Sequence, residues 1–94
     1  MNEATFRKFV LEKLRQRGFH TNAIESHQTG SGIPDANICG HGIHEWIEFK
    51  YTASRKKGLR LRPAQAAWFK RRVRAGGEPI LLAQIDLQPR SYIL

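Results

Sequence analysis

Side chains alternate in character along Glu45–Tyr51, and this alternation constrains the fold more than any other feature of the chain. Glu48 and Lys50 are charged, while Ile47 and Phe49 are apolar. Successive side chains of a β-strand point to opposite faces of a sheet. A strand here therefore buries the two apolar side chains in a core and presents the two charged ones together on the other face.

A hairpin is expected just before this strand. Gly40-His41-Gly42 is typical of a tight turn, and Ala36–Cys39 precedes it as a second short strand. If these residues pair with the strand that follows, the turn brings Asp35 close to Glu48.

The remaining segments complete an α/β (α+β) order. Gly18 ends a first amphipathic helix, Pro63 lies in the first turn of a second, and Gly76-Gly77 ends it. The order predicted is α-β-β-β-α-β. The expected elements are a helix over residues 3–17, extended segments over 22–28, 36–39 and 45–51, a helix over 62–75 and a buried strand over 80–85.

Positive charge is concentrated in the second half of the chain. The 94 residues include 16 Lys and Arg against 8 Asp and Glu, a net charge of +8, and the ten cations from Lys50 to Arg74 are interrupted by no acid. Such a surface binds phosphate backbones, which favours nucleic acid over an acidic-lipid surface or a merely solvated face. The candidate DNA contacts are Arg55, Lys56, Lys57, Arg60, Arg62, Lys70, Arg71, Arg72 and Arg74.

Length and cysteine content set further bounds. The chain is short enough to form a single domain over residues 1–94, and it has no apolar run of the roughly 18–20 residues that span a bilayer, so no membrane partner is expected. Its one cysteine, Cys39, excludes an internal disulfide and favours a reducing, cytoplasmic setting. Cys39, His41 and His44 have a zinc-like spacing, but the pattern lacks a second pair of ligands.

Asp35 and Glu48 are the candidate metal ligands. Two adjacent carboxylates repel each other unless a cation lies between them, and Mg²⁺ or Mn²⁺ prefers oxygen ligands. The backbone carbonyl of Phe49 offers a further ligand, and Lys50 could stabilise charge that develops on a phosphate or orient an attacking water. The alternatives are a simple Pro-Asp turn and a salt bridge on the surface of a strand.

Three segments in this order resemble the motifs of the PD-(D/E)xK nuclease superfamily, and in particular its virus-type replication-repair nuclease (VRR-Nuc) branch. They are Gly32-Ile33-Pro34-Asp35, Glu48-Phe49-Lys50, and Leu61-Arg62-Pro63-Ala64-Gln65-Ala66-Ala67-Trp68. The resemblance covers residues 3–85. It implies a restriction-endonuclease-like core, in which helices flank a mixed sheet, and a metal-dependent phosphodiesterase that often acts on branched DNA.

The resemblance also implies roles for individual residues. Asp35 and Glu48 would hold the metal, Lys50 would act on the water or the transition state, and Gln65 would approach the site from the second helix. Small stand-alone members of the branch are found in phages and bacteria and resemble homodimeric Holliday junction resolvases. The resemblance therefore implies a homodimer in the cytoplasm of a bacterial or phage-infected cell.

The family uses a further glutamate on the first helix, for which Glu3 and Glu12 are candidates. The apolar stripe of this helix comprises Phe6, Phe9, Val10 and Leu14. At about 100° per residue, Glu3 falls at about 300°, inside the arc from Phe6 to Leu14, and Glu12 falls on the opposite side. A glutamate among core-facing residues needs a compensating charge, so we expect Glu3 to be a metal ligand. The alternative is that Glu3 only stabilises the helix dipole.

The sequence therefore predicts a Mg²⁺- or Mn²⁺-dependent endodeoxyribonuclease that prefers Holliday junctions or flaps. So short a chain leaves little room for a sequence-reading module, and a two-fold dimer suits a branched duplex with two equivalent cut sites. The expected interface material is Tyr92-Ile93-Leu94 with Phe6 or Phe9. Two alternatives remain open: a non-catalytic basic DNA-binding module, and a sequence-specific restriction-type nuclease.

Overall fold

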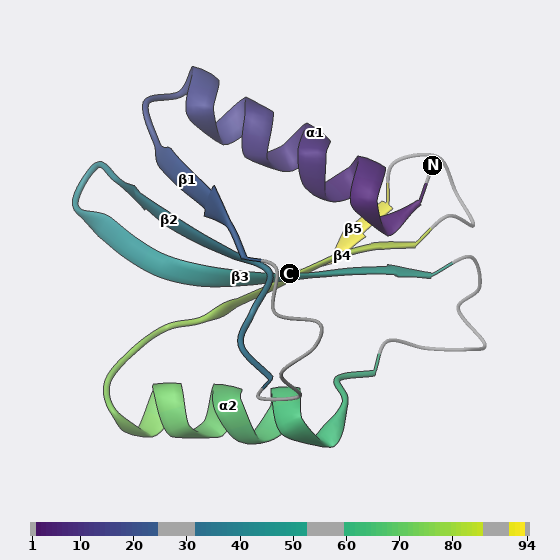
Figure 1. Ribbon diagram of the computed structural model, residues 1–94, viewed down its shortest axis with the longest axis vertical. Coiled ribbons are helices and arrows are strands. Elements are labelled where there is room, and N and C mark those ends of the chain that lie inside the picture. The colour runs from purple at the N-terminus through teal and green to yellow at the C-terminus, as the bar shows by residue number, and fades with distance from the viewer. Residues whose placement is uncertain (1, 25–31, 53–59, 86–90, 94) are drawn as a thin grey trace.

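Two helices and five strands form the part of the chain that the structure, a computed structural model, describes: residues 2–24, 32–52, 60–85 and 91–93. The elements are α1 (Glu3–Gln16), β1 (His20–Ala23), β2 (Ala36–Gly40), β3 (Ile43–Thr52), α2 (Pro63–Arg74), β4 (Ile80–Ile85) and β5 (Ser91–Ile93). Figure 1 shows the strands as a central layer, with α1 on one face and α2 on the other. The expected α+β order is confirmed, with one strand added at its end.

The sheet is mixed, as expected, and its strands follow the order β1-β2-β3-β4-β5. Only β3 and β4 pair in parallel, with Ile47 opposite Ile80; the other described neighbours are antiparallel. Parallel neighbours need a crossover connection because the chain must return to the starting edge. The segment that contains α2 provides this crossover (Figure 1).

The expected hairpin joins β2 to β3, and it pairs Ala36 with Ile47. His41 and Gly42 have φ angles of 52° and 79°. Positive φ at both central residues is the geometry of the tight turns that match the twist of paired strands, and a glycine adopts it without steric cost. The turn fixes the register, and the register determines which residues of β3 face each helix.

The core lies between α1 and the sheet. Its buried members are Phe6, Leu11, Ala36, Ile38, Ile47 and Phe49. The stripe predicted for α1 was wrong at Phe9, which is 47% exposed, and it omitted Leu11, which is buried. At about 100° per residue, Phe9 falls at about 180° and Leu11 at about 20°, so the buried arc runs from Phe6 past Leu14 to Leu11.

Element ends differ from the sequence expectations by a few residues. The extended segment expected at residues 22–28 begins earlier, at His20, because β1 pairs with β2 from His20 opposite Cys39. Residues 25–28 lie outside the described part of the chain. Strand β5 was not expected, since three residues are too few to show alternation. Neither described helix is long and apolar enough to cross a membrane.

Candidate active site

Strand β3 positions the two charged residues that the alternation singled out. Phe49 points into the core, where its ring meets Phe6 edge-on at 5.8 Å between centroids, and no part of it is exposed. Its neighbours Glu48 and Lys50 point to the opposite face of the sheet, toward α2, where both contact Gln65. The expected division of β3 into a core face and a charged face is confirmed.

Asp35 directly precedes the first residue of β2, at the edge where β3 extends beyond its pairing with β2. Pairing between the two strands stops at Ala36 opposite Ile47, so β2 does not pair with Glu48 and Phe49. Asp35 takes this place, and its Oδ2 accepts a hydrogen bond from the backbone N–H of Phe49 at 2.9 Å. The N–H and C=O of one strand residue point to the same side, so the carbonyl of Phe49 is directed to the same edge.

Gln65 connects the charged face of β3 to the first turn of α2. Its Nε2 donates to Glu48 Oε2 at 2.9 Å, and its Oε1 accepts from Lys50 Nζ at 3.0 Å. The same Oε1 also accepts from the backbone N–H of Arg62 at 2.9 Å. Although Gln65 is polar, it is only 4% exposed. The structure thus brings Glu48, Lys50 and Gln65 into one hydrogen-bonded group.

The carboxylate of Glu48 lies in an unusual electrostatic environment. It is 2% exposed, and burial followed by the negative charge of Asp35 raises its pKa. Lys50 opposes this shift, with Nζ 3.3 Å from Oε2. The other oxygen, Oε1, is buried, and no described residue donates a hydrogen bond to it. A buried carboxylate oxygen without a donor is costly, which leaves Oε1 suited to a cation.

The oxygen ligands that Asp35, Glu48 and Phe49 can offer fit a hard divalent cation. Asp35 and Glu48 supply carboxylate oxygens and Phe49 a carbonyl oxygen, all of the kind that Mg²⁺ and Mn²⁺ bind. Within the described ranges, no three His, Cys, Asp or Glu side chains gather at one point. Mg²⁺ is commonly held by one or two carboxylates, with water and substrate phosphate completing its shell, so two carboxylates suffice.

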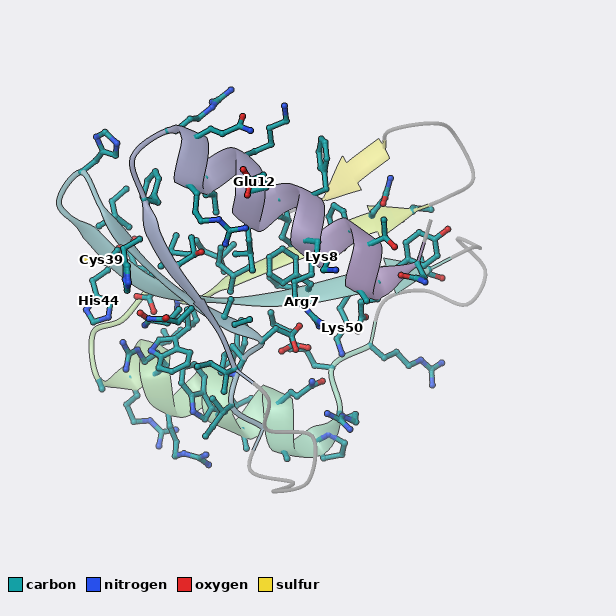
Figure 2. All side chains as sticks on the ribbon, turned by 45° about the horizontal axis from the view of Figure 1, so that its top comes forward. Arg7, Lys8, Glu12, Cys39, His44 and Lys50 are labelled. Atoms are coloured by element: carbon teal, nitrogen blue, oxygen red, sulfur yellow. The ribbon has the colours of Figure 1, made fainter. Side chains whose placement is uncertain are left out.

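The two glutamates of α1 occupy different environments. Burial and the charge of Asp35 are the main causes of the raised pKa of Glu48, and the negative charge of Glu3 adds a smaller contribution. Glu12 instead pairs with Arg15 at 2.9 Å, and hydrogen bonding and charge from Arg15 lower its pKa. Figure 2 shows Glu12 on α1 well away from Lys50, which lies below the helix. The wheel argument placed Glu3 among the core-facing residues of α1, but its side chain is exposed, so its role as a metal ligand stays a prediction.

Arg7 is a cation of α1 that the sequence reasoning did not single out. It lies one turn after Glu3 on α1 and is partly buried. The signal was present in the sequence, because Arg7 falls at about 340° on the wheel, within the buried arc.

The basic residues of the second half fall into three groups. Exposed cations are Arg60, Arg62, Lys70, Arg71 and Arg74. Arg72 differs, because its Nε lies 3.5 Å from Glu45 Oε1 and its guanidinium lies 5.6 Å from the centre of the Trp68 ring. Arg55, Lys56 and Lys57 lie outside the described residues.

Glu45 is the partner that the sequence did not single out for Arg72. It is 8% exposed, and its Oε2 accepts a hydrogen bond from the backbone N–H of Glu78 at 2.7 Å. Arg72 and Glu45 therefore join the last turns of α2 to β3 and to the segment that leads into β4.

The zinc-like spacing at Cys39 does not bring its three residues together. His41 turns toward the end of α1, where its Nε2 lies 2.6 Å from the carbonyl oxygen of Arg17. His44 instead contacts the side chain of Asn37 at 3.1 Å. The histidines thus have separate partners on different elements.

Comparison with known proteins finds similarity among solved structures. No protein-family model matches the chain, and no curated protein matches it in sequence. Among solved structures it is similar to Hjc from Archaeoglobus fulgidus, a Holliday junction resolvase from an archaeal hyperthermophile, with a TM-score of 0.70 and 18% identity over 95% of this chain and 72% of that one. At this identity the match shows the fold. The chain therefore has the restriction-endonuclease-like fold, a mixed sheet flanked by helices, shared with this resolvase.

Proposed function

We propose that this protein is a Mg²⁺- or Mn²⁺-dependent endonuclease of the PD-(D/E)xK superfamily, of the VRR-Nuc type, and that it cleaves branched DNA. The observation that carries the proposal is the buried Glu48, whose Oε1 lacks a donor among the described residues while Asp35, Lys50 and Gln65 surround the rest of the group. The resolvase fold and the basic surface of α2 support the same conclusion.

Each residue has a role that its contacts suggest. Asp35, Glu48 and the carbonyl of Phe49 would hold the cation, and Glu3, which does not gather with the two carboxylates in the described structure, would act from α1 through its charge. A divalent cation supplies Lewis-acid activation of a water and of the phosphate. Lys50 Nζ, which already lies beside Glu48, would orient the water or stabilise the charge that develops on the phosphate. Gln65 would keep Glu48 and Lys50 in place.

DNA would approach over α2 and the first turns of α1. Lys70, Arg71 and Arg74 are exposed and can contact phosphates, whereas Arg72 is held by Glu45 and Trp68. Arg7 would contact a phosphate next to the one that is cleaved. A DNA-cleaving role would place the protein where DNA lies, in the cytoplasm of a bacterial or phage-infected cell.

A homodimer would use Phe9 of α1, which is 47% exposed, as part of its interface. Of the interface residues expected from the sequence, Phe6 is fully buried and unable to contact a partner, because it packs under α1 against Phe49.

Cleavage of defined DNA substrates tests the function. A Holliday junction, a flap and a linear duplex are incubated with the protein, with and without Mg²⁺ or Mn²⁺. We expect metal-dependent cleavage of the branched substrates, and a loss of about 10²-fold or more for Asp35→Ala, Glu48→Ala or Lys50→Ala with DNA binding retained. Glu12→Ala is the control. Binding without cleavage in either metal would identify a binding module, and cleavage of one linear sequence would identify a restriction-type enzyme.

A further inference from the structure

Gly32 lies directly against the first turn of α2. Its φ angle is +77°, a conformation that other residues rarely adopt. A Cβ added at this position would overlap the backbone carbonyl of Ala64 and lie 2.8 Å from the backbone nitrogen of Gln65. Both neighbours are backbone groups of a helix, so neither can rotate away as a flexible side chain would.

The contact joins two parts of the proposed active site. Gly32 begins the segment Gly32-Ile33-Pro34-Asp35, which is anchored by the buried Pro34 and ends at the carboxylate bonded to Phe49 N. The helical turn that it touches carries Gln65, whose amide donates to Glu48 and accepts from Lys50. The distance between this segment and α2 therefore determines whether the amide of Gln65 can reach both charged groups.

We propose that Gly32 is a positioning residue of the active site, because its missing side chain lets α2 approach closely enough for Gln65 to fix Glu48 and Lys50. The inference rests on the proposed function. It adds an uncharged residue, Gly32, to those that determine the geometry of the active site. With Gln65 Nε2 and Lys50 Nζ both on Oε2, the other oxygen of Glu48 stays available to a cation. A side chain at position 32 would separate the two elements and release Glu48 to turn.

Gly42 provides a matched control for the strain that any substitution adds at Gly32. Its φ angle is +79°, almost that of Gly32, yet a Cβ there would meet nothing within 4 Å. Gly42→Ala thus introduces the same unfavourable backbone conformation in the turn between β2 and β3, without a collision. Differences between Gly32→Ala and Gly42→Ala report the contact with α2.

Hydrogen exchange at the backbone amide of Arg62 tests the contact between Gly32 and α2 independently of enzymatic activity. In the wild type this N–H donates to Gln65 Oε1, which protects it. We expect exchange at Arg62 to be about tenfold faster in Gly32→Ala and in Gln65→Ala, and unchanged in Gly42→Ala. Protection at Arg62 that is equal in Gly32→Ala and Gly42→Ala would overturn the proposal.

Mn²⁺ affinity, measured by calorimetry without DNA, gives a second readout. We expect Gly32→Ala and Gln65→Ala each to weaken binding about 10-fold or more, and the double variant to bind no worse than Gln65→Ala alone, since both act through one contact. If the losses of Mn²⁺ affinity in the two single variants add up in the double variant, Gly32 does not act through Gln65. If the Ala variants do not fold, Gly32→Asn and Gly42→Asn repeat the comparison, because Asn tolerates positive φ. A wild type that neither binds Mn²⁺ nor cleaves DNA would refute the proposed function, while exchange at Arg62 would still test the contact.

Discussion

The backbone N–H of Phe49 donates a hydrogen bond to Oδ2 of Asp35, and this bond holds a loop carboxylate against the strand that carries Glu48 and Lys50. The bond replaces the ladder contact that β2 would have made had it continued past Ala36. Asp35 thus occupies the position at the edge of β3 that a longer β2 would have filled. This gives the edge of β3 a second carboxylate beside the buried Glu48.

The charge of Glu48 is expected to reduce the stability of the metal-free protein. Burial and Asp35 raise the pKa of this carboxyl, so the folded protein holds its proton more tightly than the unfolded chain. Stability therefore falls as the pH rises from 4.5, the ordinary value, through the raised pKa, and it stays lower at neutral pH. Glu48→Gln should therefore raise the melting temperature at pH 7, because the amide removes the buried charge and keeps a similar shape.

Calorimetry in metal-free buffer measures this effect, with Glu12→Gln as the control because Glu12 is exposed and paired with Arg15. The wild type should gain stability when Mg²⁺ or Mn²⁺ is added, and Glu48→Gln should not. A lower melting temperature for Glu48→Gln than for the wild type would show that the buried charge is well compensated.

Metal affinity should depend on pH through the same carboxyl. A cation binds the ionised form of Glu48, so Mn²⁺ affinity should decline as the pH falls through the raised pKa, at a pH above that expected for an ordinary glutamate. Titrations of the wild type between pH 7.5 and pH 4.5 would measure the decline. An affinity that declines only around the ordinary glutamate value of 4.5 would mean that the carboxyl of Glu48 does not take part in binding.

Glu3 and Glu12 should differ in their effect on cleavage. Glu3 lies where its charge raises the pKa of Glu48, and Glu12 is engaged by Arg15. Glu3→Gln should reduce metal-dependent cleavage by about 10-fold or more, whereas Glu12→Gln should leave it near the wild-type rate. Rates at saturating DNA and several Mn²⁺ concentrations measure the difference. Small, equal effects would limit Glu3 to stabilising the N-terminus of α1.

The exposed cations of α2 should account for part of the salt dependence of DNA binding. If Lys70, Arg71 and Arg74 each contact one phosphate, replacing all three by Ala should reduce the slope of log K against log salt by about 0.9 per residue, or about 2.7. Arg72→Ala should instead cost about 1–2 kcal/mol of stability, because it removes contacts with Glu45 and Trp68. An unchanged slope in the triple variant would place DNA on another surface.

Arg7 and Lys8 are adjacent on α1 but differ in burial. Arg7 is partly buried, and Lys8 is exposed. Arg7→Ala should lower the cleavage rate at saturating DNA by about tenfold or more, and Lys8→Ala should change mainly the affinity for DNA. Single-turnover kinetics separates the two. Identical behaviour of the two variants would assign Arg7 to general charge attraction.

Much of the fold could be predicted from the sequence, because its signals are local. The alternation around Phe49 and the turn at Gly42 determine the hairpin, and Pro63 marks the start of α2. The burial of Leu11 and the exposure of Phe9 depend on how α1 rotates over the sheet, which a four-residue stripe leaves open. Strand β5 has only three residues and is defined by its pairing with β4, the strand directly before it in the chain.

The candidate site was predictable in its residue types but not in its connections. The proximity of Asp35 to Glu48 followed from the hairpin register. The hydrogen bonds that Gln65 makes to both Glu48 and Lys50, and the ion pair between Arg72 and Glu45, depend on where α2 lies over the sheet. No local pattern in the sequence indicates how closely α2 packs on the sheet. The contact of Gly32 with the first turn of α2 is part of what determines this distance.

The parallel pairing of β3 and β4 has a consequence for the order of folding. The hairpin of β2 and β3 is local and can form early, whereas β4 joins β3 only after the whole of α2 has been made. Pairing between distant segments is slow because the intervening loop must first be closed. On a ribosome, a chain that ends before α2 already contains Asp35 and Glu48 but lacks Gln65, which packs against Glu48 in the complete fold. The buried carboxylate, and any hydrolytic competence that depends on it, therefore arises only once the C-terminal half has been synthesised and has packed.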